Sequence, residues 1–504
     1  MSFVRSMASV STRCTLQNSR RFMNSPDKLN FLVIISDEHR RDAMGCMGHP
    51  VVTTPHLDAL AARGTLFTNA YTASPMCVPT RAALATGRYV NRDGFWDSAT
   101  PYDGSVRSWM HQVRDSGYDM ASIGKLHFRD GEADNGFSEE ILPMHVVGGV
   151  GWAVGLLRKD PPAYDVAAEL AADSGRGETS YTGYDRAITT AATDWINDPD
   201  RLTKPWAAFV SLVSPHYPLS APDEFYDAYA ETAFDLTPEP LPDHPEIRNL
   251  ADFFDYDRHF TAATRQAAMA GYFGLTSFMD DCVGQILASL ADSGQTENTV
   301  VIYLSDHGEM LGEKGLWTKQ VMYEASAGIP VIMAGPGVPA AHVCTTAVSL
   351  VDVAATAQEV SGNQSRSDQD GTSLRRLAQH ADDPERPVFS EYHDGGSSTG
   401  AFMIRWHHWK YIHYAGMPPQ LFNLASDPEE TADLGTDPSH RHVRDEGLRR
   451  LRDFCDPDAV NARCFADQAR RIEALGGVDA CREAYVFNHT PTPEEQTARK
   501  ASHE

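Results

Sequence analysis

Alternating segments of hydrophobic pattern predict the fold. Two short apolar runs, FLVIIS at 31–36 and TVVIYLS at 299–305, lack the in-out alternation of a half-exposed strand. Such runs are typical of strands buried on both faces of a parallel sheet. Helical spacing is found at 54–63, 106–116 and 260–289, and further strand-like runs at 120–123 and 206–213. This alternation predicts an α/β fold whose large domain has a mainly parallel central sheet.

Polar residues directly follow both apolar runs. Asp37 and Glu38 come after the first run, and Asp306 and His307 come after the second. Because open α/β sheets bind ligands at the carboxyl ends of their strands, we expect these four side chains to converge there. A single acid after a strand is often only a helix cap. Two apolar strands that are each followed directly by such polar residues favour one shared site.

The pattern changes near residue 385. PVFSEYH, AFMIRWHHWKYIHY and QLFNL are short aromatic and β-branched runs separated by turns, which predict a small antiparallel sheet in an α+β domain. We therefore divide the chain into a disordered extension at 1–27, a main domain at 28–365, an antiparallel-sheet subdomain at 366–440, and a helical segment with a tail at 441–504. The polar stretch 361–384 is expected to be a surface connection.

The stretch SPMCVPTRAALATGRY at 74–89 carries distinctive chemistry. Pro79 suits the first position of a helix and Gly87 its end, so Cys77 is expected just before a helix N-terminus. Unpaired N–H groups and the helix dipole attract anions there, and Arg81 adds a fixed positive charge. The segment favours a tetrahedral oxyanion beside the sulfur, or beside a group made from it. A buried cysteine before an ordinary capped helix is the alternative.

Composition limits the partners. The chain has 504 residues, of which 42% are hydrophobic, and a formal net charge of −26 at pH 7. A chain of this size can bury a large core and form more than one domain. The acidic surface discourages nucleic-acid binding, and no run of about 18 apolar residues is present to span a membrane. A small anionic substrate would therefore be attracted by local positive groups. The sequence leaves open whether the protein forms a homo-oligomer.

Cysteine usage and the N-terminal residues bear on the compartment. The eight cysteines are scattered without a C-x-x-C pair, which argues against a disulfide scaffold and a structural zinc site. We therefore expect a reducing, cytoplasmic location. Residues 1–27 have four arginines and many serines but no apolar stretch typical of a secretory signal. They are similar in composition to a transit peptide, or they precede a true start near Met23.

The residues around Cys77 resemble a known signature. CVPTR at 77–81, followed by TGR at 86–88, is similar to the C-x-P-x-R and T-G-R pattern of the type I sulfatases of the alkaline phosphatase superfamily. The resemblance implies an alkaline-phosphatase-like fold. It also implies that a maturation enzyme oxidises Cys77 to formylglycine, whose hydrated aldehyde supplies the attacking oxygen. Thr80 stands where this family most often has Ser or Ala.

Three further segments resemble the family and occur in its order. SIGKLH is similar to a G-K-x-H motif, which implies that Lys125 contacts the sulfate and that His127 holds or deprotonates the formylglycine hydrate. SPHYP is similar to a P-H-x-P motif, whose histidine, here His216, faces the leaving-group oxygen. SDHGEMLGEKGLWTK is the longest match, and within it Lys319 corresponds to a second lysine that binds the sulfate. WKYIHY and PPQLFNLASDPEE resemble the family's C-terminal domain.

The resemblance also implies one divalent metal ion. Its ligands would be Asp37, Asp306, His307, the oxygen derived from Cys77 and, at a position where the family has a second Asp or a Gln, Glu38. Carboxylates favour Ca²⁺ or Mg²⁺, whereas an imidazole moves the preference toward Mn²⁺. We expect Ca²⁺, with Mn²⁺ as the alternative. Most sulfatases have Asp-Asn at this position. The Asp306-His307 pair found here is instead similar to the pair in choline sulfatases and phosphonate monoester hydrolases.

The expected activity is hydrolysis of sulfate monoesters to an alcohol and inorganic sulfate. One metal ion and three cations, Arg81, Lys125 and Lys319, would neutralise the nonbridging oxygens, and the histidines would move protons. GEKGLWTK and the tail segment CREAYVFNHT look most like the corresponding segments of choline sulfatases. Choline sulfate is therefore the leading candidate substrate, and aryl sulfates are the alternative. The alternatives are a phosphonate monoester or phosphodiester hydrolase and a catalytically silent binding protein.

Overall fold

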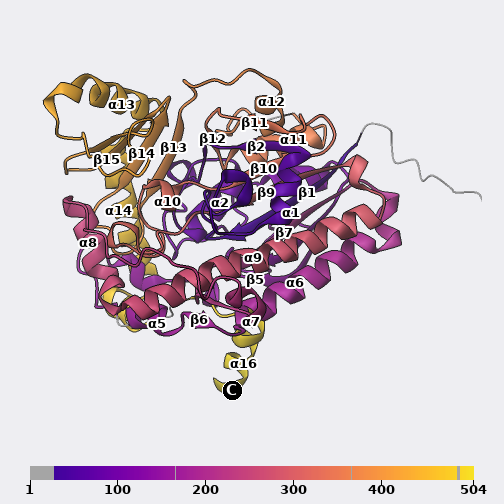
Figure 1. Ribbon diagram of the computed structural model, residues 1–504, viewed down its shortest axis with the longest axis horizontal. Helices are drawn as coiled ribbons and strands as arrows, with labels where there is room; N and C mark the ends of the chain where they lie inside the picture. The colour runs from indigo at the N-terminus through magenta and orange to yellow at the C-terminus, as the bar shows by residue number, and fades with distance from the viewer. Residues whose placement is uncertain (1–27, 165, 365, 485–488, 504) are drawn as a thin grey trace, which may run out of the picture.

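The computed structural model describes residues 28–164, 166–364, 366–484 and 489–503, and the extension predicted at 1–27 lies outside them. A large α/β domain and a smaller domain with an antiparallel sheet make up this part of the chain (Figure 1). Among the described residues, no helix combines the length and the apolar character needed to cross a bilayer.

An eight-stranded sheet forms the centre of the large domain. Its strands are β1 (Asn30–Asp37), β2 (Gly64–Phe67), β4 (Asp119–Lys125), β5 (Glu139–Met144), β7 (Trp206–Pro215), β9 (Thr299–Ser305), β10 (Val331–Ala334) and β11 (His342–Cys344). Their order is β11-β2-β10-β9-β1-β7-β4-β5. Only β10 runs antiparallel to its neighbours in this sheet, so the mainly parallel sheet predicted from the sequence is confirmed.

Helices cover both faces of the sheet, as the unbroken apolar runs require. One face packs against α2 (Cys77–Thr86), α4 (Trp109–Asp115) and α11 (Asp352–Val360), and the other against α1 (Pro55–Ala62), α6 (Ser180–Asn197) and α9 (Ala262–Asp292). Along β1, Phe31, Val33 and Ile35 pack on the first face, whereas Leu32 and Ile34 pack on the second. All five side chains are at most 1% exposed, so one polar substitution among them would disrupt the packing of helices on that face of the sheet.

The helix that carries Cys77 begins earlier than the sequence predicted. Cys77 is the first residue of α2 and Pro79 the third, and the first helical hydrogen bond runs from the Thr80 N–H to the Met76 carbonyl. A proline is tolerated at the third position because that N–H has no partner within the helix. The helix ends as expected at Gly87, whose φ of 69° is left-handed, with its N–H bonded to the Ala83 carbonyl.

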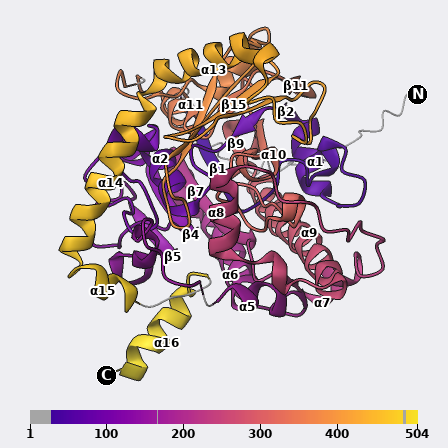
Figure 2. The same ribbon diagram turned by 90° about the vertical axis from the view of Figure 1, so that its left-hand side faces the viewer.

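The smaller domain is the antiparallel sheet expected after residue 385. Its strands β13 (Val388–Tyr392), β14 (Ala401–Trp406), β15 (Trp409–Tyr414) and β16 (Gln420–Asn423) pair in chain order. Helix α13 (Arg441–Phe454) packs on this sheet, and α14 (Pro457–Ala474) follows along the outside of the molecule (Figure 2). Two more helices, α15 (Val478–Arg482) and α16 (Pro493–His503), lie in the last part of the chain, for which the sequence predicted a helical segment with a tail.

The stretch 361–384 is not only a surface connection. It contains the helix α12 (Leu374–Gln379), whose Leu374 and Ala378 are buried in the core beneath the sheet. These two apolar side chains are four residues apart and therefore share one helix face. The polar composition around them concealed this short amphipathic pattern.

Helices and short strands outside these layers complete the chain. They are α3 (Val90–Asp93), α5 (Ala167–Ala172), α7 (Asp223–Asp227), α8 (Pro245–Phe254), α10 (Glu324–Ala327), β3 (Ala70–Tyr71), β6 (Gly175–Arg176), β8 (Ser220–Ala221) and β12 (Val348–Ser349).

Candidate active site

The candidate site lies where β1 and β9 end side by side. Ser36 pairs with Ser305 in the parallel register, so Asp37 and Asp306 leave the two neighbouring strands at the same level. Both carboxylates are fully buried. The convergence of these strand ends, expected from the sequence, is therefore observed.

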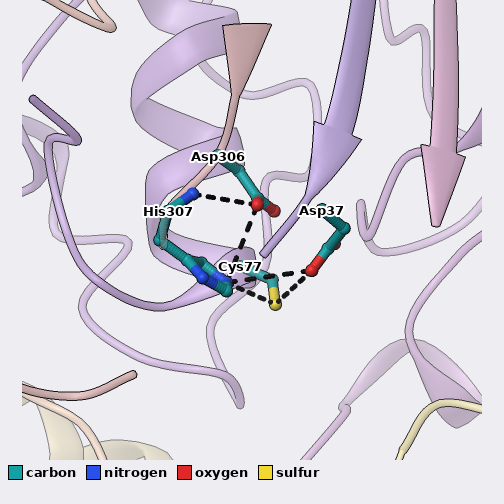
Figure 3. A group of neighbouring side chains, drawn as sticks. All are labelled: Asp37, Cys77, Asp306 and His307. Carbon is teal, nitrogen blue, oxygen red and sulfur yellow. Dashed lines mark hydrogen bonds and ion pairs between the residues drawn. The ribbon is translucent and has the colours of Figure 1, made fainter. Parts of the chain in front are cut away.

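Four side chains from three elements meet at this edge. Figure 3 shows Cys77, from the start of α2, facing Asp37, Asp306 and His307. The Cys77 Sγ atom lies 3.1 Å from His307 Nε2 and 3.6 Å from Asp37 Oδ1. One donor atom from each of the four residues lies within 4.8 Å of the others, which is close enough for a single metal ion to reach all of them.

Hydrogen bonding fixes the tautomer of His307. Its Nδ1 atom lies 3.0 Å from the Gly308 carbonyl oxygen, which can only accept, so Nδ1 carries the proton. The Nε2 lone pair then faces the other three donors. A ring held this way by its second nitrogen is typical of a metal-ligating histidine. The donor set therefore fits a divalent cation.

The thiol of Cys77 is a poor nucleophile in these surroundings. Burial raises its pKa well above the ordinary value, and the negative charge of Asp37 adds to that effect. Since the thiolate is the reactive form of cysteine, the unmodified side chain would be almost fully protonated near neutral pH. A nucleophile at position 77 is therefore expected to be a different group that is made from the cysteine.

Arg81 and Lys125 bind the carboxylates of this site. Arg81 donates from Nη2 to Asp37 Oδ2 and from Nε to Asp306 Oδ2, each at 2.9 Å. The Lys125 Nζ atom lies 2.7 Å from Asp37 Oδ2. Burial alone would raise the pKa of Asp37, but the charges of Lys125 and the Arg81 guanidinium hold it well below its usual range. Both cations were expected to face a sulfate group, and neither lines the open cavity described below.

Glu38 forms a second group with Lys319 and His216. The Lys319 ammonium donates to Glu38 Oε2 and to His216 Nε2, each at 3.0 Å. Glu38 does not belong to the four-residue cluster around Cys77; it shares Asp37 with His216 in a second possible donor group. The structure thus gives Glu38 an ion-pair partner that the sequence had not suggested.

The hydrogen bonds of His216 also settle its tautomer. Its Nδ1 atom lies 2.6 Å from the Tyr217 carbonyl oxygen, so Nδ1 holds the proton and Nε2 accepts from Lys319. Burial lowers the pKa of His216 well below its ordinary value, and the Lys319 charge lowers it further. The free protein therefore carries a neutral His216 beside a charged Lys319.

His127 is buried and keeps both ring nitrogens available. Neither nitrogen has a hydrogen-bond partner among the residues that the structure describes. Burial lowers the pKa of His127 well below its ordinary value, and Lys125 and Arg81 act in the same direction. A neutral imidazole without partners can accept a proton from a group in front of it.

A cavity of about 80 Å³ opens onto these groups. Cys77, His127, His216 and Lys319 line part of its wall. Its outer wall is aromatic and consists of Trp152, Tyr164, Tyr217, Phe254 and Tyr256, together with His489 and Thr490 from the tail.

Several residues at the site were missed by sequence reasoning. Ser211 on β7 accepts from Arg81 Nη1 at 2.9 Å, and Gln320 lines the cavity next to Lys319. The Tyr181 hydroxyl donates to the Thr490 carbonyl at 2.6 Å, which fixes the tail beside the cavity. Only the tail had a usable signal, the segment CREAYVFNHT.

Comparison with protein families gives two matches. A family model described as "Sulfatase" matches residues 29–362, and one described as "N-sulphoglucosamine sulphohydrolase, C-terminal" matches residues 312–455. The choline-sulfatase of Rhizobium meliloti (strain 1021) is 31% identical over 490 residues, which cover 92% of this chain and 94% of that protein. Arylsulfatase K of Danio rerio is 29% identical over 455 residues, covering 85% of each chain.

Solved structures share the fold. The phosphonate monoester hydrolase of Agrobacterium radiobacter aligns with a TM-score of 0.69 at 22% identity, covering 84% of this chain and 96% of that one. The phosphonate monoester hydrolase of Silicibacter pomeroyi aligns with a TM-score of 0.68 at 24% identity, covering 86% and 96%. At this identity the likeness concerns the arrangement of helices and strands.

Proposed function

The chain belongs to the sulfatase family and is a sulfuric ester hydrolase, and on this premise we propose that it cleaves small sulfate monoesters with a formylglycine made from Cys77 and one divalent metal ion. The observation that carries the proposal is the meeting of two groups at one cavity. Cys77, a member of the donor cluster, lines this cavity, and His127, His216 and Lys319 open onto the same space.

The metal ion would be held by Asp37, Asp306, His307 and the oxygen at position 77. Two buried carboxylates and one imidazole whose Nε2 lone pair points inward form a donor set that supports this assignment. When bound, the ion would polarise a sulfate oxygen and offset negative charge. Three hard oxygens favour Ca²⁺, and the imidazole keeps Mn²⁺ as the alternative. Glu38, paired with Lys319, is left outside the ligand set of this proposal.

A formylglycine at position 77 would supply a hydrated aldehyde as the source of the attacking oxygen. The high pKa of the buried thiol supports this proposal, because the unmodified cysteine offers little thiolate. A formylglycine-generating maturation enzyme is therefore proposed as a partner. It would act on the chain before folding, since Cys77 is only 5% exposed in the folded protein.

Arg81 and Lys125 would prepare the site from behind. Arg81 bridges Asp37 and Asp306 and so fixes the direction of both carboxylates, while Lys125 keeps Asp37 ionised. Such partners behind metal ligands orient them and tune the affinity for the ion. We assign these two cations to positioning.

Lys319 and His216 would act at the leaving-group end. Lys319 can donate to a sulfate oxygen because it already directs two N–H bonds into the cavity wall, and neighbouring acidic groups, Glu38 and Asp37 among them, raise its pKa above the ordinary value against the effect of burial. His216 starts with its Nε2 unprotonated. It can protonate the leaving oxygen only after Nε2 has taken up a proton.

His127 would take the proton from the second hydroxyl at position 77. It lines the cavity beside Cys77, it is neutral, and its nitrogens have no partner among the described residues. Removing that proton lets the sulfate leave and restores the aldehyde.

The size of the cavity favours a small leaving group. About 80 Å³ between aromatic walls suits a small alkyl or aryl alcohol. Aromatic faces also attract quaternary ammonium groups, so choline sulfate is the leading candidate and aryl sulfates are the second.

The experiment compares three esters on the matured enzyme with added metal ion. We expect kcat/KM for choline sulfate and 4-nitrophenyl sulfate to exceed that for a 4-nitrophenyl phosphonate monoester by at least about tenfold, or 1.4 kcal/mol. Preference for the phosphonate would replace the proposal with the phosphonate monoester hydrolase alternative.

A further inference from the structure

A second cavity adjoins the first on the side of α8. It has a volume of about 280 Å³, more than three times that of the aromatic cavity. The two cavities share four wall residues, Phe254, Tyr256, Lys319 and Gln320. A group bound beside Cys77 that outgrows the first cavity would therefore reach the second one.

The walls of the second cavity are acidic. Asp255 is paired with Arg258 at 2.7 Å, and Asp257 is paired with Arg265 and accepts from Trp317 Nε1. Two further carboxylates line it, Glu239 and Asp252, and neither has an ion-pair partner among the described residues.

Glu239 and Asp252 both lie in exposed positions. Glu239 accepts only a backbone N–H, that of Lys314 at 2.8 Å. Lys319, the one cation that the described residues contribute to this wall, is already paired with Glu38 at 3.0 Å. The cavity thus offers uncompensated negative charge.

Gln320 stands between the two cavities with a free donor. Its side chain is 5% exposed, and its Oε1 accepts from the Thr318 hydroxyl at 2.8 Å. In the described part of the chain, its Nε2 has no hydrogen-bond partner, and the residue lines both cavities. This N–H group is not sealed in the core, so it is available to donate to an acceptor atom of a ligand in either cavity.

We propose that the second cavity is a leaving-group subsite that binds an ammonium group carried by the alcohol of the substrate, with Gln320 donating to an oxygen of that alcohol. The inference rests on the proposed function, because it concerns the same ester. A sulfate ester with a cationic end matches the site in charge: its negative end lies beside Cys77 and the charged Lys319 in the first cavity, and its positive end near Glu239 and Asp252.

The test is a series of ester pairs on the matured, metal-loaded full chain. Each pair consists of an ω-aminoalkyl sulfate and the hydroxyalkyl sulfate of equal length, from ethyl to hexyl. We expect the ratio of kcat/KM, amino over hydroxy, to be smallest for the shortest pair, whose ammonium contacts only the aromatic side chains of the first cavity. For the longer pairs, whose ammonium reaches the second cavity, we expect about tenfold in favour of the amine.

Variants assign the preference to the cavity. Glu239→Gln combined with Asp252→Asn should bring the ratio for the long pairs to about one and leave the hydroxyalkyl sulfates unchanged. Asp194→Asn with Glu224→Gln removes two exposed carboxylates that line neither cavity, and it should keep the preference. Gln320→Ala should raise KM for long esters of both kinds without changing the ratio.

The outcomes separate the two claims. A ratio near one at every length, or a preference that survives in the Glu239 and Asp252 variant, would overturn the subsite while hydrolysis of the hydroxyalkyl sulfates upholds the proposed function. If no sulfate ester of either series and no 4-nitrophenyl sulfate is hydrolysed, the proposed function fails and the subsite fails with it.

Discussion

Replacing Arg81 by lysine tests how the site is organised. The arginine is 2% exposed and makes four hydrogen bonds of 2.9 Å, to Asp37, Asp306, Ser211 and the Lys125 carbonyl. Lysine keeps the charge but has a single nitrogen, so it cannot bridge both carboxylates from fixed directions. The substitution therefore removes orientation while it leaves the net charge of the site unchanged.

The magnitude follows from the lost contacts. A lysine can recover about two of the four bonds, and buried bonds to charged partners are worth about 1.5–3 kcal/mol each. We expect Arg81→Lys to lower the free energy of unfolding by about 3 kcal/mol. Misdirected carboxylates should also weaken metal binding about 10- to 100-fold and lower kcat/KM at least about 100-fold.

Folding and catalysis are measured on the same preparation. Metal affinity is determined by titration, kcat/KM with 4-nitrophenyl sulfate, and stability by thermal unfolding. Arg158→Lys is the matched control, because Arg158 is also buried, bonds to the Ser397 carbonyl and Gln468 Oε1, and forms no hydrogen bond or ion pair with a described residue of the site. It should reduce stability and leave kcat/KM per folded molecule unchanged.

The reasoning about Arg81 would be refuted by either of two results. Arg81→Lys with wild-type metal affinity and wild-type kcat/KM would show that the bridge between Asp37 and Asp306 is unimportant. An equal loss of activity in Arg158→Lys would show that activity merely follows stability.

Three further predictions concern Lys319, the metal ion and pH. Lys319→Met should lower kcat/KM about 100-fold or more, because the cavity loses its charged donor; steady-state kinetics with little change would contradict this role. Chelation should abolish activity and lower the melting temperature, because an ion held by Asp37, Asp306 and His307 stabilises the folded chain to which it binds, and added Ca²⁺ or Mn²⁺ should restore both. Burial and the neighbouring Asp97 raise the pKa of Asp394 from 3.8 to about 7, so the stabilisation from its bound proton is full below pH 3.8 and lost as the pH rises through 7. Asp394→Asn should therefore flatten the fall of melting temperature between pH 4 and 7, and an unchanged slope would count against this assignment.

The sequence predicted the centre of the fold and the inner end of the site. The apolar runs before Asp37 and Asp306 identified two buried parallel strands, and strands in such a sheet must end at one edge. The C-x-P-x-R motif around Cys77 then assigned this residue to the same site. Those predictions depended on local pattern, which a sequence displays directly.

Side-chain directions could not be predicted in the same way. Arg81 and Lys125 were expected to face the sulfate, yet both point to carboxylates, because the choice depends on strands that come together only in the folded chain. Glu38 pairs with Lys319 over a separation of 281 residues. Gln320 and Ser211 have no motif of their own, and only the folded chain brings them to the site.

The central claim is that formylglycine at position 77 performs the chemistry. The most direct test is the mass of the tryptic peptide from Gly64 to Arg81, taken from protein that has been coexpressed with a formylglycine-generating enzyme and hydrolyses 4-nitrophenyl sulfate. We predict an aldehyde in place of the Cys77 thiol, in a fraction that rises in proportion to the activity of each preparation. Full activity in protein whose peptide carries only the intact thiol would contradict the account.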